Sequence, residues 1–585
     1  AARSTEAGGT EVLAVGADGK FSKVYSCGVF ETCAPVAFNK DDKRVYMQTN
    51  KGDNVDLIRL VLFDPATGKE ELVEQDPLGR VDFGGMYISD RTKEIVLTSY
   101  TDDKTRVYFK DKEFEKDYNS IKKRLGEREI SFNSSTKDEN LWIVSSFSDT
   151  DPGTIWLFDR KTKNLSTLYQ VREKLPREAL AKMTPIRYKS SDGLEIPAYL
   201  TLPKGVEPKN LPTVVLVHGG PWGRDVWGYN SNAQFLANRG YAVLQPNFRA
   251  STGFGKKFLN AGNRQWGEKM QDDITWGVKH LIGQGIADPK RVGIMGGSYG
   301  GYATLAGVTF TPDLYAAAVA IVAPSNLITL LESIPPYWAS LRTTFYERMG
   351  NPNTPEGKAQ LIKQSPLTHA DKIKTPLLIV HGANDPRVNK RESDQIVIAL
   401  RDRGYPVEYL LAPDEGHGFQ RPVNNMAMFA RGEEFLAKHL GGRYQRGGTP
   451  EILARLKEIT VDPKTVSLTT AKRDDSNSSS SAPAVNLGGK WTMTADAGGQ
   501  TIEIALDLKQ SGADFSGTIS SMHGGGTVEK GKISGSNLTG TIKAEVQGQV
   551  MEIQMEGKVG SDGKMTGTLS GPGIPALAFT ATKAQ

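Results

Sequence analysis

The spacing of apolar residues changes along the chain and divides it into three structured parts. In residues 1–178, short apolar runs are separated by polar turns, which is typical of antiparallel strands. Residues 179–445 alternate short apolar runs with longer amphipathic segments, and this pattern predicts a mostly parallel sheet interleaved with helices. Residues 488–585 alternate apolar and polar positions strictly and predict a small antiparallel barrel or sandwich. The polar, serine-rich range 446–487 predicts a flexible linker.

The first part repeats itself. The segments "EVLAVGADGK", "LVLFDPATGK", "RVYFKDKEFE" and "TIWLFDRKTK" align on Val15, Phe63, Phe109 and Phe158. A period of about 46 to 49 residues with several strands per repeat is typical of β-propeller blades. About four blades are visible in the sequence, so we expect a partial propeller that lacks blades at its amino-terminal side. Its first blade would expose strand edges near residues 10–25, and such edges favour association with a second copy of the chain.

A serine flanked by glycines follows one of the apolar runs of the middle part. Residues 292–302 read "VGIMGGSYGGY", and the Ala- and Leu-rich stretch after them predicts a helix. Ser298 therefore lies where a strand turns into a helix, in the pattern G-x-S-x-G. At such a sharp turn the serine is strained, and side chains two residues before or after it would clash. The pattern predicts a nucleophilic serine, and a plain glycine-rich turn is the alternative.

A serine hydroxyl needs a base, and the base needs an orienting acid. Downstream of the serine, Asp385 follows the apolar run Leu377–Val380, and His417 follows Val407–Leu411. An open parallel sheet places its ligands at the carboxyl ends of its strands. The chain order Ser298, Asp385, His417 therefore predicts a catalytic triad at one edge of the sheet.

Other acids and histidines compete for these roles. Asp414 and Glu415 are too close to His417 in sequence to orient it easily from across a sheet. His218 and His381 each stand at the end of a strand before a glycine, and we interpret them as packed, hydrogen-bonded structural residues.

Backbone donors for an oxyanion hole are expected on two segments. The first is the N–H of Tyr299, directly after the serine, and the second belongs to the "HGGP" loop after the strand at 214–217. Glycines in that loop would let its backbone approach a substrate oxygen, while an ordinary strand-end turn is the alternative.

Six segments together resemble the prolyl-oligopeptidase family of serine peptidases, and most closely its acylaminoacyl-peptidase and dipeptidyl-aminopeptidase branches. They are "HGGPWG", "NFRASTGFG", "WGEKMQDDITWGVKHLI", "DPKRVGIMGGSYGGY", "GANDPRV" and "DEGHGF", within residues 185–440. The resemblance implies an α/β-hydrolase domain with the nucleophile Ser298, the orienting acid Asp385 and the base His417. It also implies an oxyanion hole from the N–H groups of Gly220 and Tyr299. Arg387 stands where the family binds a substrate carbonyl, and a surface salt bridge is its alternative role.

The resemblance implies a serine peptidase that hydrolyses short peptides through an acyl-enzyme, and the propeller would exclude folded proteins. A carboxylic-ester hydrolase with the same triad is the alternative, and a non-catalytic hydrolase fold is a third. The propeller repeats favour the peptidase. Dipeptidyl peptidases hold a free amine with paired glutamates, but Glu70 and Glu71 follow a turn and look like surface residues. Acylaminoacyl-peptidase or oligopeptidase action is therefore favoured, and an incomplete propeller would weaken the size limit on substrates.

Composition narrows the function classes further. The net charge is +5 over 585 residues with both signs mixed, so neither nucleic acid nor an anionic membrane is an expected partner. The longest apolar run, "AAAVAIVA", is far shorter than the roughly 18 residues of a membrane span. There is no H-E-x-x-H motif and no P-loop in the sequence, and we expect neither a metal nor a cofactor.

Two cysteines, Cys27 and Cys33, are close enough in sequence to pair in a tight loop. A disulfide would suit an oxidising compartment and favours a periplasmic or secreted location, while two free thiols are the alternative. The chain starts "AARSTEAGG", with neither methionine nor a signal-peptide pattern, which we interpret as a processed or cut amino terminus.

Overall fold

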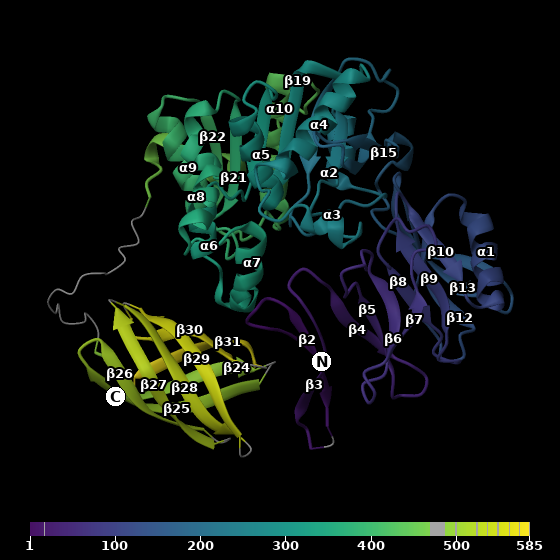
Figure 1. Ribbon diagram of the computed structural model, residues 1–585. Coiled ribbons are helices and arrows are strands. Elements are labelled where there is room, and N and C mark those ends of the chain that lie inside the picture. The colour runs from purple at the N-terminus through teal and green to yellow at the C-terminus, as the bar shows by residue number, and fades with distance from the viewer. Residues whose placement is uncertain are drawn as a thin grey trace. The chain divides into compact units, whose positions relative to one another are not determined.

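The computed structural model describes most of the chain in two compact units. It describes residues 1–468 except residue 17, and residues 486–583 except 498–499, 522–523, 535, 547–548, 561 and 572–573. The units are residues 1–469 and 470–585. The first contains strands β1–β23 and all the described helices, and the second contains strands β24–β31 (Figure 1). The serine-rich run of the predicted linker lies outside the described residues.

Four consecutive antiparallel sheets open the first unit, in the orders β1-β2-β3, β4-β5-β6-β7, β8-β9-β10 and β11-β12-β13-β14. Their bounds are β1 Ala2–Ser4, β2 Thr10–Val15, β3 Phe21–Cys27, β4 Cys33–Phe38, β5 Val45–Thr49, β6 Arg59–Phe63, β7 Glu70–Glu74, β8 Gly85–Ile88, β9 Ile95–Thr101, β10 Thr105–Phe109, β11 Glu129–Ser135, β12 Leu141–Ser148, β13 Asp151–Asp159 and β14 Asn164–Gln170. The four repeated sequence segments contain most of β2, β6, β10 and β13, one strand from each sheet. One sequence repeat is therefore one sheet, as expected for four blades. The association expected at the first sheet stays a prediction.

A helix that the strand pattern does not predict follows the third sheet. Helix α1 (Lys112–Leu125) is capped by Asp111, whose side chain accepts the backbone N–H of Phe114. Phe114 and Ile121 are buried on one face of the helix, and the ring centroid of Phe114 lies 5.8 Å from that of Trp142 in the fourth sheet. The helix covers apolar residues of the third and fourth sheets in one core cluster.

A nine-stranded sheet forms the centre of the hydrolase part, in the order β15-β16-β18-β17-β19-β20-β21-β22-β23. Its bounds are β15 Met183–Lys189, β16 Glu195–Thr201, β17 Leu211–Val217, β18 Ala242–Pro246, β19 Ala287–Gly297, β20 Ala317–Ile321, β21 Leu377–Gly382, β22 Val407–Ala412 and β23 Thr460–Val461. Strands β17 to β22 run parallel to one another, while β15, β16 and β23 pair antiparallel at the margins. The mostly parallel sheet predicted from the sequence is confirmed.

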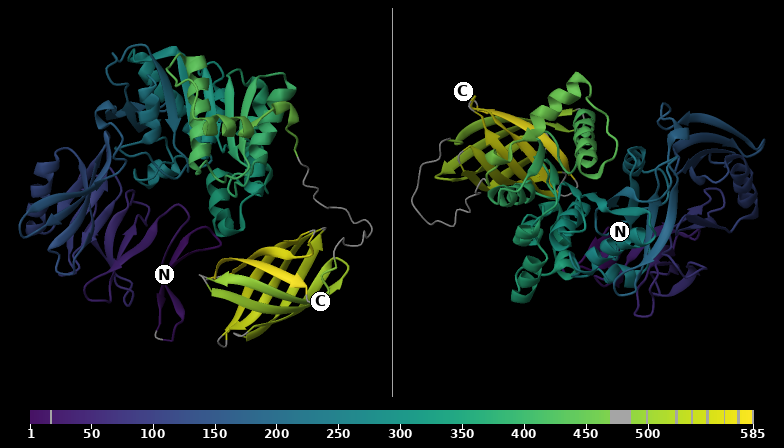
Figure 2. Two further views of the ribbon diagram at one scale, coloured as in Figure 1. Left: turned by 180° about the vertical axis from the view of Figure 1, so that it is seen from behind. Right: turned by 90° about the horizontal axis from the view of Figure 1, so that it is seen from above.

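Helices pack on both faces of this sheet (Figure 2). Their bounds are α2 Ser231–Asn238, α3 Lys256–Asn260, α4 Lys269–Gly283, α5 Tyr299–Phe310, α6 Leu327–Glu332, α7 Arg342–Met349, α8 Pro355–Lys363, α9 Arg391–Asp402, α10 Pro422–Leu440 and α11 Pro450–Ile459. In β19, Val292 and Ile294 belong to the core shared with α4, α5 and α9. Met295 belongs to the opposite core, with α2 and α10. The alternation of strand side chains thus builds two apolar layers around one sheet.

The range predicted as a flexible linker contains structured residues. Helix α11 lies inside it, and strand β23 pairs with Tyr409 and Leu410 of β22 at the edge of the sheet. Ile459, at the end of α11, is completely buried in the hydrolase core. The segment "PEILARLKEI" is amphipathic, so it packs although the serine-rich run follows soon after it.

The second unit is a closed eight-stranded barrel in the order β24 to β31, closed because β31 pairs with β24. Its bounds are β24 Gly489–Ala497, β25 Gln500–Ser511, β26 Asp514–Ser521, β27 Gly524–Ser534, β28 Asn537–Val546, β29 Gln549–Val559, β30 Met565–Gly571 and β31 Ile574–Lys583. Leu506 and Leu508, two positions apart on β25 and therefore on one face of the strand, point into the barrel with Trp491, Phe515 and Phe579. Of the two predicted architectures, the barrel is confirmed.

The open question of the cysteines is settled by a disulfide. Cys27 at the end of β3 is bonded to Cys33 at the start of β4, and both are buried in the core of the first two sheets. The bond closes the short loop 28–32. That loop therefore has both ends fixed by a covalent link.

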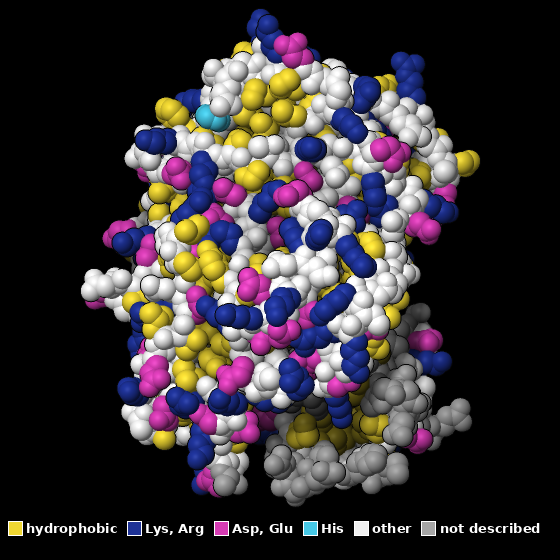
Figure 3. Space-filling model, turned by 90° about the vertical axis from the view of Figure 1, so that its right-hand side faces the viewer, with side chains coloured by type: hydrophobic (Ala, Val, Ile, Leu, Met, Phe, Trp, Pro, Cys, Tyr) yellow, Lys and Arg dark blue, Asp and Glu magenta, His cyan; other side chains and the backbone are white. Residues whose placement is uncertain are grey.

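One face of the molecule shows lysine and arginine side chains interspersed with acidic ones, without a broad area of either sign (Figure 3). This mixing agrees with the small net charge of +5. Among the described helices, none has a stretch both apolar enough and long enough to span a bilayer.

Candidate active site

Ser298 stands between β19 and α5 at the carboxyl edge of the parallel strands. Its φ is +59°, in the left-handed region that residues other than glycine rarely adopt. A Cβ atom on Gly300 would lie 2.1 Å from the carbonyl oxygen of Val217, and one on Gly296 would lie 2.5 Å from that of Gly300. Only glycine fits at either position, which is the physical reason for the G-x-S-x-G pattern.

Two segments of backbone approach this serine. Tyr299 is the first residue of α5, where the N–H groups have no acceptor within the helix. A Cβ atom on Gly219 would lie 3.1 Å from the carbonyl oxygen of Gly297 and 3.5 Å from Cβ of Ser298. The loop that contains Gly219 and Gly220 therefore contacts the sharp turn at Ser298. Gly220 lines the same cavity as Ser298.

His417 and Asp385 lie at the same edge of the sheet, after the neighbouring parallel strands β22 and β21. A hydrogen bond of 2.7 Å joins Nδ1 of His417 to Oδ2 of Asp385. The other carboxylate oxygen accepts the backbone N–H groups of Arg387 at 2.8 Å and Val388 at 3.0 Å. Burial raises the pKa of Asp385, but these hydrogen bonds outweigh it and hold the pKa below its usual range.

The acids beside His417 have other partners. Asp414 forms an ion pair with Arg455 and accepts a hydrogen bond of 3.2 Å from Asn424. Glu415 accepts a hydrogen bond of 2.8 Å from the same Asn424 side chain. Of the three acids weighed in the sequence, only Asp385 has a hydrogen bond with His417 among the described contacts.

The two histidines interpreted as structural are both held by hydrogen bonds. His218 Nε2 lies 2.9 Å from the hydroxyl of Ser251, and His381 Nδ1 lies 2.7 Å from that of Ser393. Burial lowers the pKa of both imidazoles. Both are therefore neutral at pH 7, and the structural interpretation is confirmed.

Ser298 and His417 are not joined directly. The described contacts include no hydrogen bond between the serine hydroxyl and the imidazole. Strands β20 and β21 lie between the strands that carry the two residues. Contacts between a nucleophile and its base are often loose without a substrate and tighten when it binds.

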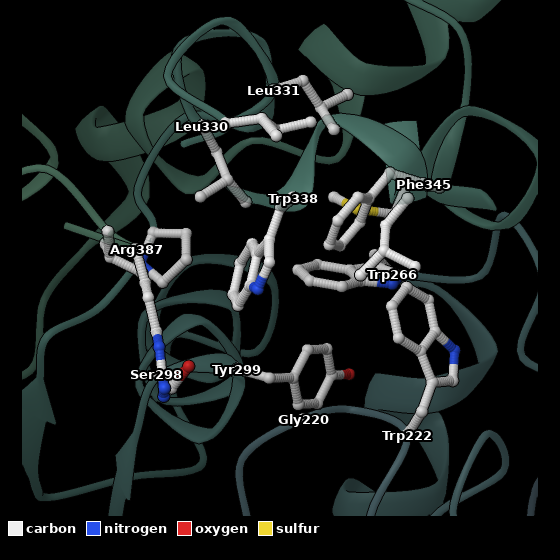
Figure 4. A pocket seen from close by; sticks show the side chains of 15 residues that line it. Gly220, Trp222, Trp266, Ser298, Tyr299, Leu330, Leu331, Trp338, Phe345 and Arg387 are labelled. Atoms are coloured by element: carbon white, nitrogen blue, oxygen red, sulfur yellow. The ribbon is translucent and has the colours of Figure 1, made fainter. Parts of the chain in front are cut away.

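An apolar cavity of about 290 Å³ opens beside Ser298 (Figure 4). Its wall includes the side chains of Trp222, Trp266, Leu330, Leu331, Trp338 and Phe345. Four of these six lie between β20 and β21, in the segment 327–349, to which the sequence analysis assigned no role. The signal was present, because "LITLLESIPPYWASLRTTFYERM" combines many apolar and aromatic residues with no strand periodicity.

Arg387 also lines this cavity, and Figure 4 shows it next to Ser298. Its guanidinium carbon lies 5.8 Å from the centroid of the Trp338 ring. In the part of the chain that the structure describes, Arg387 forms no ion pair, so it does not make the surface salt bridge considered as the alternative. Nor do three or more histidine, cysteine or acidic side chains group around a possible metal position anywhere in the described ranges.

The comparisons with known proteins agree with this architecture. The model of the "Prolyl oligopeptidase family" matches residues 227–443. The chain is 45% identical over 455 residues to "Dipeptidyl aminopeptidase BIII" of Pseudoxanthomonas mexicana, an alignment that covers 76% of this chain and 65% of the relative. It is 37% identical over 455 residues to "Dipeptidyl peptidase family member 6" of Caenorhabditis elegans, with coverage of 73% and 61%. The chain thus spans less than two thirds of the length of either relative.

Solved structures share the fold. A puromycin-hydrolysing peptidase of Mycobacterium tuberculosis superposes with a TM-score of 0.62 at 24% identity, covering 76% of this chain and 67% of that one.

Proposed function

This chain belongs to the prolyl oligopeptidase family, and on that premise we propose that it is a serine peptidase that hydrolyses short peptides after an apolar residue. The observation that carries the proposal is the hydrogen-bonded pair of His417 and Asp385 at the sheet edge that also bears Ser298 and an apolar cavity. The family supports a peptidase, and the geometry supports the roles of the residues.

In the proposed mechanism, the Ser298 hydroxyl attacks the scissile carbonyl while its proton passes to Nε2 of His417. The hydrogen bond to Asp385 favours the tautomer with its proton on Nδ1, which leaves Nε2 free to accept. His417 then gives the proton to the departing amine, and an acyl-enzyme remains on Ser298. Water repeats the same steps and releases the acid.

The carbonyl oxygen becomes negative in the tetrahedral intermediate, and we propose that the N–H groups of Tyr299 and Gly220 stabilise it. Tyr299 begins a helix, whose amino-terminal end favours negative charge. Arg387 is proposed to bind a second substrate carbonyl, because its guanidinium lies on the cavity wall next to Ser298.

The cavity supports an apolar preference at the residue that supplies the scissile carbonyl, called the acyl residue below. Tryptophan, phenylalanine and leucine side chains line the space, and a volume of about 290 Å³ holds one large side chain rather than a folded chain. A phenylalanine or leucine acyl residue is therefore expected to be cleaved faster than glycine or aspartate.

Release of dipeptides from a free amino terminus is the second form of the proposed activity. Two relatives carry the names dipeptidyl aminopeptidase and dipeptidyl peptidase, which favours it, although the sequence shows no convincing pair of glutamates for a free amine. A carboxylic-ester hydrolase remains the alternative, since the same residues attack esters.

A library of short peptides with free and acetylated amino termini tests these forms together. Release of two-residue products only from peptides with free amino termini indicates a dipeptidyl peptidase. Cleavage of both the free and the acetylated peptides indicates oligopeptidase action. Turnover of esters with no peptide cleavage would refute the peptidase. The disulfide supports the further proposal that the chain works in an oxidising compartment, periplasmic or secreted.

A further inference from the structure

Arg348 is a buried cation close to the cavity. It lies in α7, and only 7% of its surface is exposed. No acidic side chain forms an ion pair with it in the described parts of the chain. Burial lowers its pKa to about 10, so it stays charged at pH 7. A charge buried without a counterion is unfavourable, and such a residue is therefore held by other contacts.

Those contacts come from two separate parts of the first unit. Nη1 of Arg348 donates hydrogen bonds of 3.0 Å to the side-chain oxygens of Asn260 and Asn263 in the hydrolase. Nη2 donates a hydrogen bond of 3.1 Å to the carbonyl of Val29, far away in the amino-terminal sheets. The guanidinium also lies 5.4 Å from the ring centroid of Phe30. The planar fork of arginine satisfies all these partners at once.

Val29 and Phe30 belong to the loop 28–32, which the Cys27–Cys33 disulfide closes. Other contacts fix the loop in the same place. Glu31 accepts the backbone N–H of Gly28 at 3.0 Å, and Asn260 donates to the carbonyl of Phe30 at 3.2 Å. The loop therefore presents Val29 and Phe30 to Arg348 in one fixed position.

On its other side, Arg348 meets the wall of the cavity. Its guanidinium lies 5.8 Å from the ring centroid of Trp222, a wall residue. Phe345 and Met349, its neighbours on α7, also line the cavity. The rings of Trp222 and Phe345 are 5.5 Å apart, so one aromatic wall depends on where α7 and Arg348 lie.

We propose that Arg348 is a positioning residue for the apolar cavity, and that the disulfide-closed loop 28–32 of the amino-terminal sheets holds it in place. Through this contact the amino-terminal sheets set which acyl residue the hydrolase accepts. The inference rests on the proposed peptidase function and concerns selectivity, because Arg348 has no described contact with Ser298 or His417.

The test compares two peptide substrates that differ only in the acyl residue, phenylalanine or alanine. In Arg348→Met the side chain keeps an unbranched apolar stem but loses the guanidinium and its three hydrogen bonds, so the aromatic wall should shift. We expect the ratio of kcat/KM values, phenylalanine over alanine, to fall about tenfold, mainly through KM. Arg348→Lys should keep more of the ratio than Arg348→Met. Arg342→Gln, at an exposed position on the same helix, is the matched control.

Phe30→Ala tests the loop without replacing any residue of the hydrolase. Phe30 is 36% exposed, so its replacement is not expected to disturb folding. It should lower the same ratio, and the double variant with Arg348→Met should fall no further than Arg348→Met alone, because Phe30 acts through Arg348. Replacing both cysteines by serine should lower the ratio in the same direction.

Labelling of Ser298 by a fluorophosphonate distinguishes a failure of the proposed peptidase function from a failure of the positioning role. A wild type that is labelled but cleaves neither peptide contradicts the proposed peptidase. Labelled variants Arg348→Met and Phe30→Ala that both keep the wild-type ratio contradict the positioning role alone. If Arg348→Met does not fold, the ratio measured for Phe30→Ala decides.

Discussion

Replacing Asp385 by asparagine is the sharpest test of the proposed site. The side chain of Asp385 is fully buried, and its two oxygens accept three hydrogen bonds. Asparagine has almost the same shape, so its oxygen can still accept the N–H groups of Arg387 and Val388. Its amide nitrogen would then face Nδ1 of His417 and donate to it.

The expected loss follows from this reversed hydrogen bond. When Nδ1 accepts, the imidazole carries its proton on Nε2 and cannot take one from Ser298. The variant also loses the negative charge that stabilises the imidazolium. The same substitution of the triad acid lowers turnover by about 10⁴-fold in serine proteases of another fold, and we expect a similar loss in kcat here.

Asp414→Asn is the matched control, because it replaces an acid three residues before His417 whose partners are Arg455 and Asn424. Its kcat should stay within a few-fold of wild type. The assay is release of a chromogenic amine from a short peptide with a phenylalanine acyl residue, with thermal melting of each variant alongside. A steep loss in Asp414→Asn and a mild one in Asp385→Asn would refute the assignment of the acid.

Three further predictions address the nucleophile, the domain boundary and pH. Ser298→Ala should abolish turnover and fluorophosphonate labelling while its far-ultraviolet circular dichroism stays that of wild type; labelling at another serine would contradict the role of Ser298. A chain ending at residue 468 should hydrolyse a small ester within a few-fold of wild type. A chain ending at residue 445 should melt at a lower temperature or be insoluble, because it loses β23 and the buried Ile459. Equal melting temperatures of the two truncated chains would contradict this boundary. Because folding lowers the pKa of Asp385, its carboxylate stabilises the fold above its ordinary pKa of about 4, and this stabilisation is lost as pH falls through the lower folded value. The difference in Tm between wild type and Asp385→Asn should therefore shrink between about pH 6 and about pH 3, and a difference independent of pH would contradict it.

Residues whose geometry depends on local sequence could be predicted. Gly296 and Gly300 flank Ser298 because any larger side chain would collide with backbone within the same strand-turn-helix unit or its neighbour. Asp385 and His417 could be placed because each follows an apolar strand, and parallel strands end at one edge. By contrast, the serine-rich composition of the range around α11 predicted a flexible linker there. The burial of α11 depends on contacts with a sheet edge that is distant in sequence.

The apolar and aromatic residues of 327–349 are visible in the sequence, but their place in a cavity wall depends on contacts between distant segments, as Arg348 shows most clearly. In sequence it is an ordinary arginine near the end of a helix, where cations are favourable and usually solvated. Its burial is created by Val29 and Phe30, more than three hundred residues away, and by Asn260 and Asn263 on a different segment. No periodicity links these positions. Selectivity in this fold is therefore expected to change through substitutions in the amino-terminal sheets that leave the catalytic motifs intact.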